Sequence, residues 1–381
     1  MIETKKLIEI ADVIDSLHQT PEYVEEGIPM VRVTDVKPGD LLLDGCQFVT
    51  EDVFEKFTAN HVPHKGDIVI SRVGTYGNFA YVADDIKFCL GQNTSIIAPR
   101  INSRYLYYFL QSPFTRRQIE SRVVGSTQKT LSLKNIKELE VPCPDEVTQK
   151  KIANVLETID LKIANNNRIN RNLLEQAQTL FSKYYDTAEE VEEFRILIDV
   201  LGGGTPKTSN DDYWNGSIPF FTPKDVGMPY TFQTEKSITE EGLQHCNSKV
   251  YPTNTTFVTA RGTVGKVSLA GVPMAMNQSC YALASEKLPE ILVYFYTLEA
   301  VKSLRHKASG AVFDAIVTRD FDTEKIRVLD YITTESFMKF ASPTFEQIHM
   351  NTVENLQLHD LRDGMLPKLM SGELDISDVK I

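Results

Sequence analysis

The sequence lacks the features that mark several classes of protein. No apolar run approaches the ~20 residues that a membrane-spanning helix requires, and one of the longest, Ile291 to Leu298, falls far short of that length. The five cysteines are scattered and never form a C-x-x-C pair. This usage is typical of reduced thiols in a cytosolic protein and not of a disulfide framework or a cysteine zinc site. We therefore expect a cytoplasmic protein without a membrane segment.

Motifs for catalysis and for metal binding are also missing. The run GGGTPKT (Gly202–Thr208) superficially resembles a phosphate-binding loop, but Pro206 stands before Lys207 where such a loop has glycine. No G-x-G-x-x-G follows a predicted strand, and no N-P-P-Y tetrapeptide of a methyltransferase occurs. His61 and His64 are three residues apart but have no cysteine pair nearby. We predict no intrinsic catalysis, no bound cofactor and no metal site.

Charge is unevenly distributed along a chain whose formal net charge is −12. The segment Asp186–Phe194 carries five acidic residues and no basic one, whereas Arg100–Lys137 carries eight basic residues against one acidic residue. Tyr105, Tyr107 and Tyr108 are interleaved with these basic residues. A basic stripe with aromatic residues favours a surface that faces a polyanion such as nucleic acid. The alternative is the solvated side of a helix, which explains most charge runs.

A long helix is predicted near the middle of the chain. Residues Val147–Tyr185 contain neither Gly nor Pro over 39 positions, and an unbroken helix of that length extends ~58 Å. Asp145 is the expected N-cap. Apolar residues recur every seven positions in two adjacent rows, a pattern that indicates a seam with a partner helix, and Asn166 interrupts one row where a polar residue would fix the register. The alternative is an ordinary long helix that packs on a domain core.

A second helix is predicted over residues 342–381 and supplies that partner. Ser342 is its expected N-cap and Pro343 its first helical residue. We expect the two helices to pair with each other in antiparallel orientation. The residues predicted to form the coiled-coil seam are Ile152, Leu156, Ile159, Ile163, Asn166, Leu173, Leu180, Ile348, Leu356, Leu361 and Met365.

The two halves of the sequence repeat each other. Ile28–Val36 matches Ile218–Val226, and Asp67–Gly77 matches Thr256–Gly265, with Gly74 paired with Gly262 at a spacing of 188 residues. We predict an α+β protein with two mixed α/β domains, residues 1–146 and 186–341, separated by the central helix (147–185) and followed by the C-terminal helix (342–381). Related by a pseudo-twofold and held at the ends of a helical rod, such domains suit a target with half-sites, as duplex DNA has.

Each half contains a glycine-rich loop with basic and polar neighbours. Such loops allow close approach to DNA, where Lys and Arg neutralise phosphates and Arg, Asn and Gln read base edges. The alternative is that the glycines shape tight β-turns which the polar residues cap. The candidate DNA-binding residues are Arg32, Arg72, Thr75, Tyr76, Asn78, Gln92, Asn93, Thr127, Gln128, Lys129, Lys224, Arg261, Thr263, Lys266, Asn277 and Gln278.

Four motifs, in order, resemble one known family. The start of the central helix, VPCPDEVTQKKIANVL (Val141–Leu156), GGTPK (Gly203–Lys207), YWNG (Tyr213–Gly216) and the C-terminal LRDGMLPKLMSGELDISDV (Leu361–Val379) are similar to motifs of type I restriction–modification specificity subunits. The resemblance implies two target-recognition domains that each read one half of a bipartite DNA sequence. It also implies that the two helices form a coiled coil that spaces the domains and docks methyltransferase subunits.

The resemblance assigns the chemistry to partner subunits. It implies a non-catalytic chain that binds double-stranded DNA and two modification methyltransferase subunits, with S-adenosylmethionine bound by those subunits. A restriction-translocase subunit that binds ATP would complete the complex. The alternative function is a scaffold whose duplicated domains bind protein partners without base readout.

Overall fold

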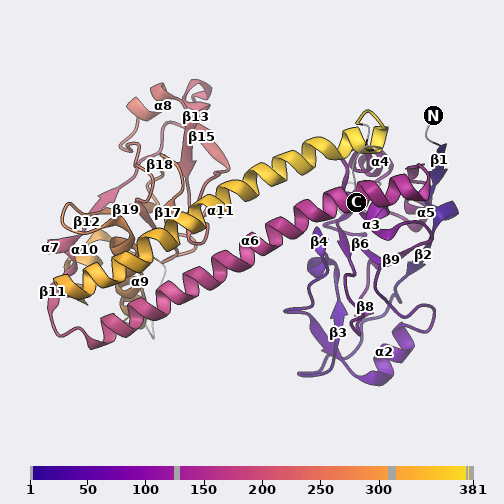
Figure 1. Cartoon of the computed structure of the whole chain (residues 1–381), viewed down its shortest axis with the longest axis horizontal. Helices are drawn as coiled ribbons and strands as arrows, with labels where there is room; N and C mark the ends of the chain where they lie inside the picture. Colours follow the sequence, from indigo (N-terminus) through magenta and orange to yellow (C-terminus); the bar gives the residue numbers. More distant parts are fainter. Residues whose placement is uncertain (1–2, 124–128, 308–314, 375, 377–381) are drawn as a thin grey trace. The chain divides into compact units, whose positions relative to one another are not determined.

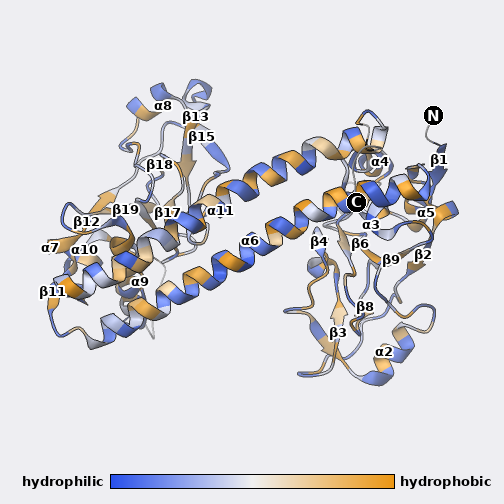
Figure 2. Ribbon diagram, in the orientation of Figure 1, coloured by the Kyte–Doolittle hydropathy of each residue, from blue (hydrophilic) through white to orange (hydrophobic). Residues whose placement is uncertain are grey.

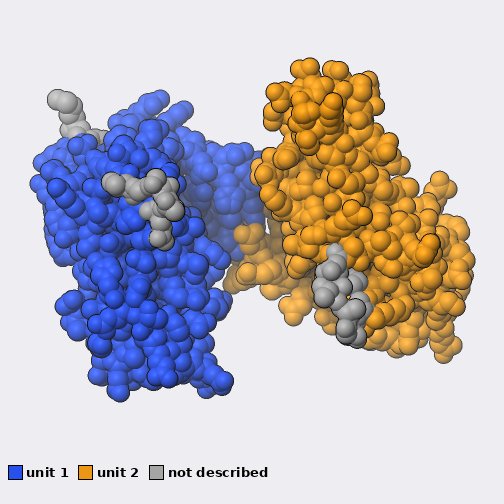
Figure 3. Space-filling model, turned by 180° about the vertical axis from the view of Figure 1, so that it is seen from behind, with its two compact units in different colours: residues 1–164, 355–381 blue, residues 165–354 orange. Residues whose placement is uncertain are grey.

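The computed structural model describes residues 3–123, 129–307, 315–374 and 376. The chain divides into two compact units, one of residues 1–164 with 355–381 and the other of residues 165–354 (Figure 3). Two long helices, α6 (Glu146–Thr187) and α11 (Tyr331–Ser371), each contribute residues to both units (Figure 1). Among the described residues, neither these helices nor any shorter one is apolar over a length that would cross a membrane.

The first unit contains two mixed sheets and a two-stranded ribbon. Its elements are β1 (Glu3–Lys6), α1 (Leu7–Ile10), β2 (Ala11–Asp15), β3 (Ile28–Val31), η1 (Val33–Asp35), β4 (Gly39–Asp40), β5 (Gln47–Val49), α2 (Glu51–Phe57), β6 (Ile68–Ser71), β7 (Phe79–Tyr81), β8 (Cys89–Leu90), β9 (Thr94–Pro99), α3 (Ser103–Gln111), α4 (Pro113–Arg122), α5 (Leu133–Lys137) and β10 (Glu140–Cys143). The strand orders are β2-β9-β6-β7-β4 and β5-β3-β8, and β1 pairs with β10.

The second unit repeats this plan. Its elements are β11 (Val191–Glu193), α7 (Phe194–Leu197), β12 (Asp199–Gly202), η2 (Asp211–Tyr213), β13 (Trp214–Phe221), β14 (Tyr230–Thr231), β15 (Lys236–Ile238), α8 (Glu240–Gln244), β16 (Thr256–Thr259), β17 (Val267–Ala270), β18 (Ala275–Met276), β19 (Cys280–Ala284), α9 (Glu290–Lys307), α10 (Thr318–Asp322) and β20 (Lys325–Arg327). The strand orders are β12-β19-β16-β17-β14 and β15-β13-β18, and β11 pairs with β20.

The two topologies are identical when ten is added to each strand number of the first unit. The central strands β6 and β16 are buried at every position. Their apolar and β-branched residues suit a strand that is covered on both faces. In both units this strand pairs antiparallel with its neighbours on either side. The predicted α+β fold and its internal repeat are confirmed.

Both long helices begin with the same cap. The Asp145 carboxylate accepts the Thr148 N–H at 3.0 Å and the Thr148 hydroxyl at 2.7 Å. Asp330 accepts the same two groups of Thr333 at 2.8 and 3.0 Å. These bonds satisfy donors that a helix start leaves unpaired, and they lower the pKa of both carboxyls. The predicted cap at Asp145 is confirmed.

The predicted start of the second helix at Ser342 is wrong, because α11 begins at Tyr331. Ser-Pro is a common helix start, but here Pro343 lies inside the helix, where it cannot donate to the carbonyl four residues earlier. Phe337, Ala341 and Phe345 on either side of it are at most 1% exposed in the core of the second unit. This burial holds the helix together across the proline, whose cost in a helix interior is ~3 kcal/mol.

In the first unit the two long helices pack on each other and on the domain. Ile152 and Leu156 of α6 are buried in one cluster with Leu366 and Leu369 of α11 and with the helix α3. The Arg362 guanidinium donates to the Asp160 carboxylate at 2.8 Å. Because residue numbers fall along α11 as they rise along α6, the pairing is antiparallel, as predicted.

In the second unit the buried row of α6 departs from the strict seven-residue repeat. Leu174 and Phe181 are 8% and 2% exposed, whereas the predicted seam residues Leu173 and Leu180 are only half-buried. A straight helix of 3.6 residues per turn drifts from a seven-residue period. Leu174 and Phe181 therefore lie on the face of α6 that packs in the core of the second unit. Hydrophobic residues recur at intervals along both long helices (Figure 2).

The other predicted seam residues also differ in how deeply they are buried. Ile159, Ile163 and Ile348 are buried, and Leu356 and Met365 are half-buried. Leu361 is 50% exposed, so its assignment to the seam is wrong.

A layer of amide side chains joins the long helices within the second unit. Asn166 is 1% exposed and donates to the Glu354 carboxylate at 2.8 Å. Asn351 donates to the Asn170 amide oxygen at 2.8 Å, and Asn170 donates to the Thr352 hydroxyl at 3.3 Å. Buried amides that must meet their partners penalise any shifted register. The role predicted for Asn166 agrees with these contacts.

Candidate nucleic-acid interface

The predicted glycine-rich loops form the same turn in both units. In the turn between β6 and β7, Gly74 and Gly77 both have φ of +73°, and between β16 and β17, Gly262 has φ of +81° and Gly265 of +73°. These values lie in the left-handed region that glycine adopts without strain. The backbone conformation of the turn therefore requires these glycines, which agrees with the alternative that they shape a tight β-turn. The turn at the same time leaves Thr75 exposed in the first unit and Arg261, Thr263 and Lys266 exposed in the second.

The backbone bonds of the two turns also correspond. The Ser71 hydroxyl donates to the Thr75 carbonyl, and the Thr259 hydroxyl donates to the Thr263 carbonyl. The N–H of Gly77 donates to Ser71, and that of Gly265 to Thr259, both at 2.8 Å. Each strand thus ends in a hydroxyl side chain that closes the turn from inside.

An arginine from a following helix braces each turn. Arg305 of α9 donates to the carbonyls of Val264 and Gly265 at 2.8 and 3.0 Å. Arg116 of α4 donates to the Tyr76 carbonyl at 3.4 Å. This role was not predicted from the sequence, although the spacing of the two arginines, 305 − 116 = 189, fits the repeat.

The repeated aspartates anchor a second loop beside each turn. Asp225 accepts the Thr222 N–H at 2.8 Å and the Glu235 N–H at 2.7 Å. Asp35 accepts the backbone N–H of Arg32 at 2.9 Å and its side-chain Nε at 3.0 Å. The match between these aspartates therefore reflects loop geometry. The Arg32 guanidinium, a candidate base reader, is held in this internal ion pair.

In the second unit the turn and the anchored loop enclose a basic cleft of about 350 Å³. Its lining residues are Thr222, Pro223, Lys224, Glu235, Lys236, Arg261, Gly262, Asn277 and Ser279. Three cationic side chains face one carboxylate there, and the Lys224 ammonium lies 3.4 Å from that carboxylate. The cleft thus combines the charge and the donors that phosphates and base edges require.

Three predicted residues, Lys224, Arg261 and Asn277, are brought together in this cleft. Arg261 is exposed, and its N–H donates to the Ser279 carbonyl at 3.3 Å. The Asn277 side-chain oxygen accepts the Ser279 N–H at 3.0 Å, which fixes the amide plane. Lys236 lies with its ammonium 5.4 Å from the centre of the Trp214 ring. Lys236 is not among the predicted residues, because nothing in its local sequence marks it as a binding residue.

In the first unit Arg72 is a structural residue and not an exposed base reader. It is 9% exposed, and its guanidinium is bonded to Asp15 and to the Leu131 carbonyl, the latter at 3.3 Å. The second unit has Ala260 at the corresponding position, where its N–H donates to the Ser279 carbonyl as that of Arg72 donates to the Asn93 carbonyl. The residue type alone does not show whether a side chain is exposed. The prediction of Arg72 as an exposed base reader is wrong.

Tyr76 and Asn78 are likewise used inside the first unit. Tyr76 is 8% exposed and its hydroxyl donates to Glu120 at 2.9 Å. The Asn78 amide donates to the Val36 carbonyl at 3.3 Å. Both residues hold the turn in place, so we withdraw them as base readers.

The remaining candidates lie on or near the surface. The Gln92 amide bonds to Thr20 at 3.1 Å, Gln278 accepts the Thr205 hydroxyl, and Asn93 is half-buried with φ of +64°. Thr127 and Gln128 lie outside the described residues. The exposed candidates are Thr75, Lys129, Lys224, Arg261, Thr263, Lys266 and Gln278.

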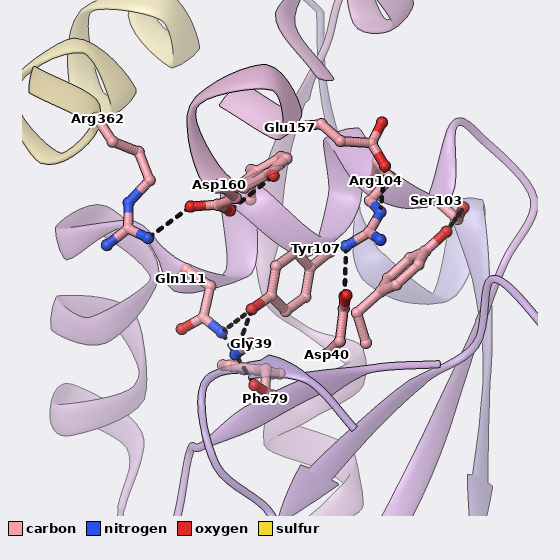
Figure 4. Close-up of polar contacts among 12 residues, drawn as sticks. Gly39, Asp40, Phe79, Ser103, Arg104, Tyr107, Gln111, Glu157, Asp160 and Arg362 are labelled. Atoms are coloured by element: carbon pink, nitrogen blue, oxygen red, sulfur yellow. Dashed lines mark hydrogen bonds and ion pairs between the residues drawn. The ribbon is translucent and has the colours of Figure 1, made fainter. Parts of the chain in front are cut away.

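The tyrosines of the basic stripe do not face a polyanion. Tyr105, Tyr107 and Tyr108 are at most 4% exposed and belong to the core of the first unit. Burial raises the pKa of all three phenols. The Tyr107 hydroxyl accepts the Gly39 N–H at 2.7 Å and a Gln111 N–H at 3.0 Å (Figure 4). The interpretation of these tyrosines as a surface is wrong.

Arg104 of the stripe joins the domain to the long helix within the first unit. Its guanidinium lies 2.8 Å from the Asp40 carboxylate and 3.1 Å from that of Glu157 on α6 (Figure 4). It also lies 3.7 Å from the centre of the Tyr81 ring. Next to it, the Tyr108 hydroxyl donates to the α6 carboxylate of Asp160 at 2.8 Å. Part of the basic stripe therefore docks the domain on its helix.

Comparison with known proteins agrees with the duplicated architecture. A family model described as the type I restriction modification DNA specificity domain matches residues 2–175 and 189–328, one match for each copy of the repeat. The MjaIX specificity subunit of Methanocaldococcus jannaschii is 22% identical over 410 residues, covering 99% of this chain and 94% of that protein. The HindI specificity subunit of Haemophilus influenzae is 22% identical, covering 81% and 87%.

A solved structure shares the fold. The S subunit of a type I restriction–modification system from M. genitalium has a TM-score of 0.61 to this chain at 15% identity, with 97% of this chain and 96% of that chain covered. The family match spans well over half of the residues. Proteins of this kind provide the DNA specificity of a restriction–modification complex and act together with its other subunits. The chain therefore belongs to the family of type I restriction–modification DNA specificity subunits.

Proposed function

We propose that each of the two domains reads one half of a bipartite DNA sequence, the second through its basic cleft and the first through the equivalent surface beside its glycine turn. One observation carries this proposal: the same turn, brace and aspartate anchor occur in both units, but the side chains that they present differ. A shared frame with different side chains suits the reading of two different half-sites.

The differences fall where base contacts would be made. Arg261 occupies the turn position that Val73 has in the first unit, one residue before the first glycine. Asn277 corresponds to Gly91, since the N–H of Asn277 donates to Phe221 as that of Gly91 donates to Val31. Arg can pair with guanine and Asn with adenine, at ~1–3 kcal/mol of discrimination each. We expect the second unit to contribute more of the direct readout in this region.

The helix starts support two equivalent docking surfaces for the modification methyltransferase. Val147 follows the first cap and Ile332 the second, 332 − 147 = 185 residues apart, and these side chains are 65% and 78% exposed. Tyr331, beside Ile332, is 77% exposed. Large apolar side chains exposed at matching positions favour partner binding over solvation. Two like sites favour two methyltransferase subunits for each specificity subunit.

Catalysis and its cofactors belong to the partners in this proposal. The methyltransferase subunits bind S-adenosylmethionine, and a restriction-translocase subunit binds ATP. The residues of this chain supply recognition: cations for phosphates, and polar side chains on a rigid turn for base edges.

DNA titration of the complex with methyltransferase subunits tests the proposal. Binding should weaken steeply with salt, with a logarithmic slope of about −0.9 for each phosphate contact. Arg261→Ala should weaken binding to the recognised sequence roughly 5- to 150-fold, as the loss of ~1–3 kcal/mol predicts. Lys302→Ala, which removes a side chain of the second unit that is 66% exposed and lies outside the cleft, is the matched control.

The rival scaffold function makes the opposite prediction. A protein-binding scaffold would show little salt dependence, no preference for any sequence, and no difference between Arg261→Ala and Lys302→Ala. That combination would refute base readout by the second unit.

A further inference from the structure

The loop between α2 and β6 gathers three metal-binding side chains in the first unit. The Nε2 atom of His61 lies 2.6 Å from Oδ2 of Asp67, and Nε2 of His64 lies 3.7 Å from Oδ1 of the same carboxylate. The candidate ligand atoms all lie within 4.8 Å of one another. The Asp67 side chain is fully buried, that of His61 is 17% exposed and that of His64 is 59% exposed.

One oxygen of this buried carboxylate has no donor. Asp67 Oδ2 is next to the His61 ring and accepts the His64 N–H at 3.0 Å. Within the described residues, Oδ1 is buried without a hydrogen-bond partner. A buried carboxylate oxygen without a partner carries a cost in free energy. A cation between Oδ1 and the His64 imidazole would remove that cost.

The turn itself does not need the side chains of His64 and Asp67. In the second unit the corresponding turn has Pro252 and Thr255 where the first has His64 and Asp67. The N–H of Thr255 donates to Pro252 at 3.2 Å, as that of Asp67 donates to His64 at 3.1 Å. The backbone carbonyls of the two residues also have matching partners. The Asp67 carbonyl accepts the Val82 N–H and the Thr255 carbonyl accepts the Ala270 N–H, both at 2.9 Å. The same turn thus forms without an imidazole or a carboxylate at these positions.

We propose that His61, His64 and Asp67 bind a divalent transition-metal ion of the Zn²⁺ type, with water completing the shell on the exposed side of His64. Two imidazoles and one carboxylate are ligands that Zn²⁺ accepts at ~2.0–2.2 Å. We expected no metal site from the sequence because no cysteine pair adjoins the histidines. The third ligand is instead a carboxylate, which precedes a buried strand and is too common a residue to be recognised in advance.

The site ties the loop to the start of β6, whose other end leads into the glycine turn. Metal binding should therefore stabilise the first unit, since an ion that binds only the folded state raises the unfolding temperature. It adds no catalytic function, and the second unit has no equivalent of it among its described residues.

Titration of the full-length chain with Zn²⁺ after removal of metal by a chelator tests the proposal. We expect one Zn²⁺ per chain, with affinity at least tenfold weaker in His64→Ala and in Asp67→Asn. His18→Ala, which removes a 61% exposed imidazole paired with Asp15 in the same unit, should bind Zn²⁺ like the wild type. Because His64 is largely exposed, metal-free His64→Ala should unfold at the temperature of the metal-free wild type. Zn²⁺ should then raise the unfolding temperature of the wild type and of His18→Ala, but not that of His64→Ala.

Co²⁺ identifies the donor atoms. Binding through nitrogen and oxygen gives visible absorption without the intense near-ultraviolet band of a cobalt–thiolate bond. The proposal is overturned if the wild type shows no saturable binding, if the variants bind as it does, or if Co²⁺ shows the thiolate band.

Discussion

Truncation of Phe181 tests how α6 packs in the second unit. The Phe181 side chain is 2% exposed, and its ring centre lies 4.8 Å from that of Phe295 and 5.5 Å from that of Phe337. Phe→Ala at such a position removes buried apolar surface and leaves a cavity, at ~3–5 kcal/mol. With ~2–4 °C for each kcal/mol in a unit of this size, Tm should fall by roughly 6–20 °C.

The single tryptophan makes the measurement specific to this unit. Trp214 lies in β13, so its fluorescence during urea unfolding reports the second unit, while circular dichroism follows the whole chain. Leu180→Ala is the matched control, because Leu180 is the adjacent residue and is only half-buried; we expect a cost of ~1–2 kcal/mol. If Leu180→Ala costs as much as Phe181→Ala, the strict seven-residue seam is correct and the packing described here is not.

Three further predictions concern buried polar groups. Burial raises the pKa of Tyr296 to about 12, whereas unfolded phenols ionise at about 10; the resulting stability is present below pH ~10 and is lost as pH rises toward the folded pKa. The tyrosinate absorbance of Tyr296, measured as the difference between the wild type and Tyr296→Phe, should therefore rise together with the loss of helical circular dichroism and not before it. Asn351→Leu should cost ~1–3 kcal/mol in urea unfolding because it leaves the Asn170 oxygen without its donor, and the double change with Asn170→Leu should recover most of that loss; a double mutant as unstable as the sum would contradict this. Tyr108→Phe should cost ~1–2 kcal/mol by removing the hydrogen bond to Asp160, and an unchanged unfolding midpoint would show that this contact does not hold the domain on α6.

Much of the architecture could be predicted because it follows from long patterns. A stretch without Gly or Pro and with apolar periodicity predicts α6, and matched motifs predict the repeat. The start of α11 could not be predicted correctly, because Asp330 caps the helix 342 − 330 = 12 residues before the Ser-Pro pair that resembles a helix start. The helix continues through Pro343 because residues on both sides of the proline are buried in the core of the second unit. That burial depends on residues distant in sequence and cannot be predicted from the local sequence.

The candidate site was only partly predictable for the same reason. Glycines at Gly74 and Gly262 predict a special turn, and both have positive φ. Whether the polar neighbours of a turn face solvent depends on what lies behind them: Arg72 meets the carboxylate of Asp15 and is buried, whereas Arg261 is exposed. Partners distant in sequence make this choice.

Exchange of one domain tests the central claim most directly. The first domain, residues 1–146, is replaced by the equivalent domain of another specificity subunit, with the buried α3 residues that face α6 retained, and the methylated sequence is mapped across genomic DNA. If each domain reads its own half, one half of the recognised sequence changes and the other stays the same. A change in both halves, or in neither, would contradict the account.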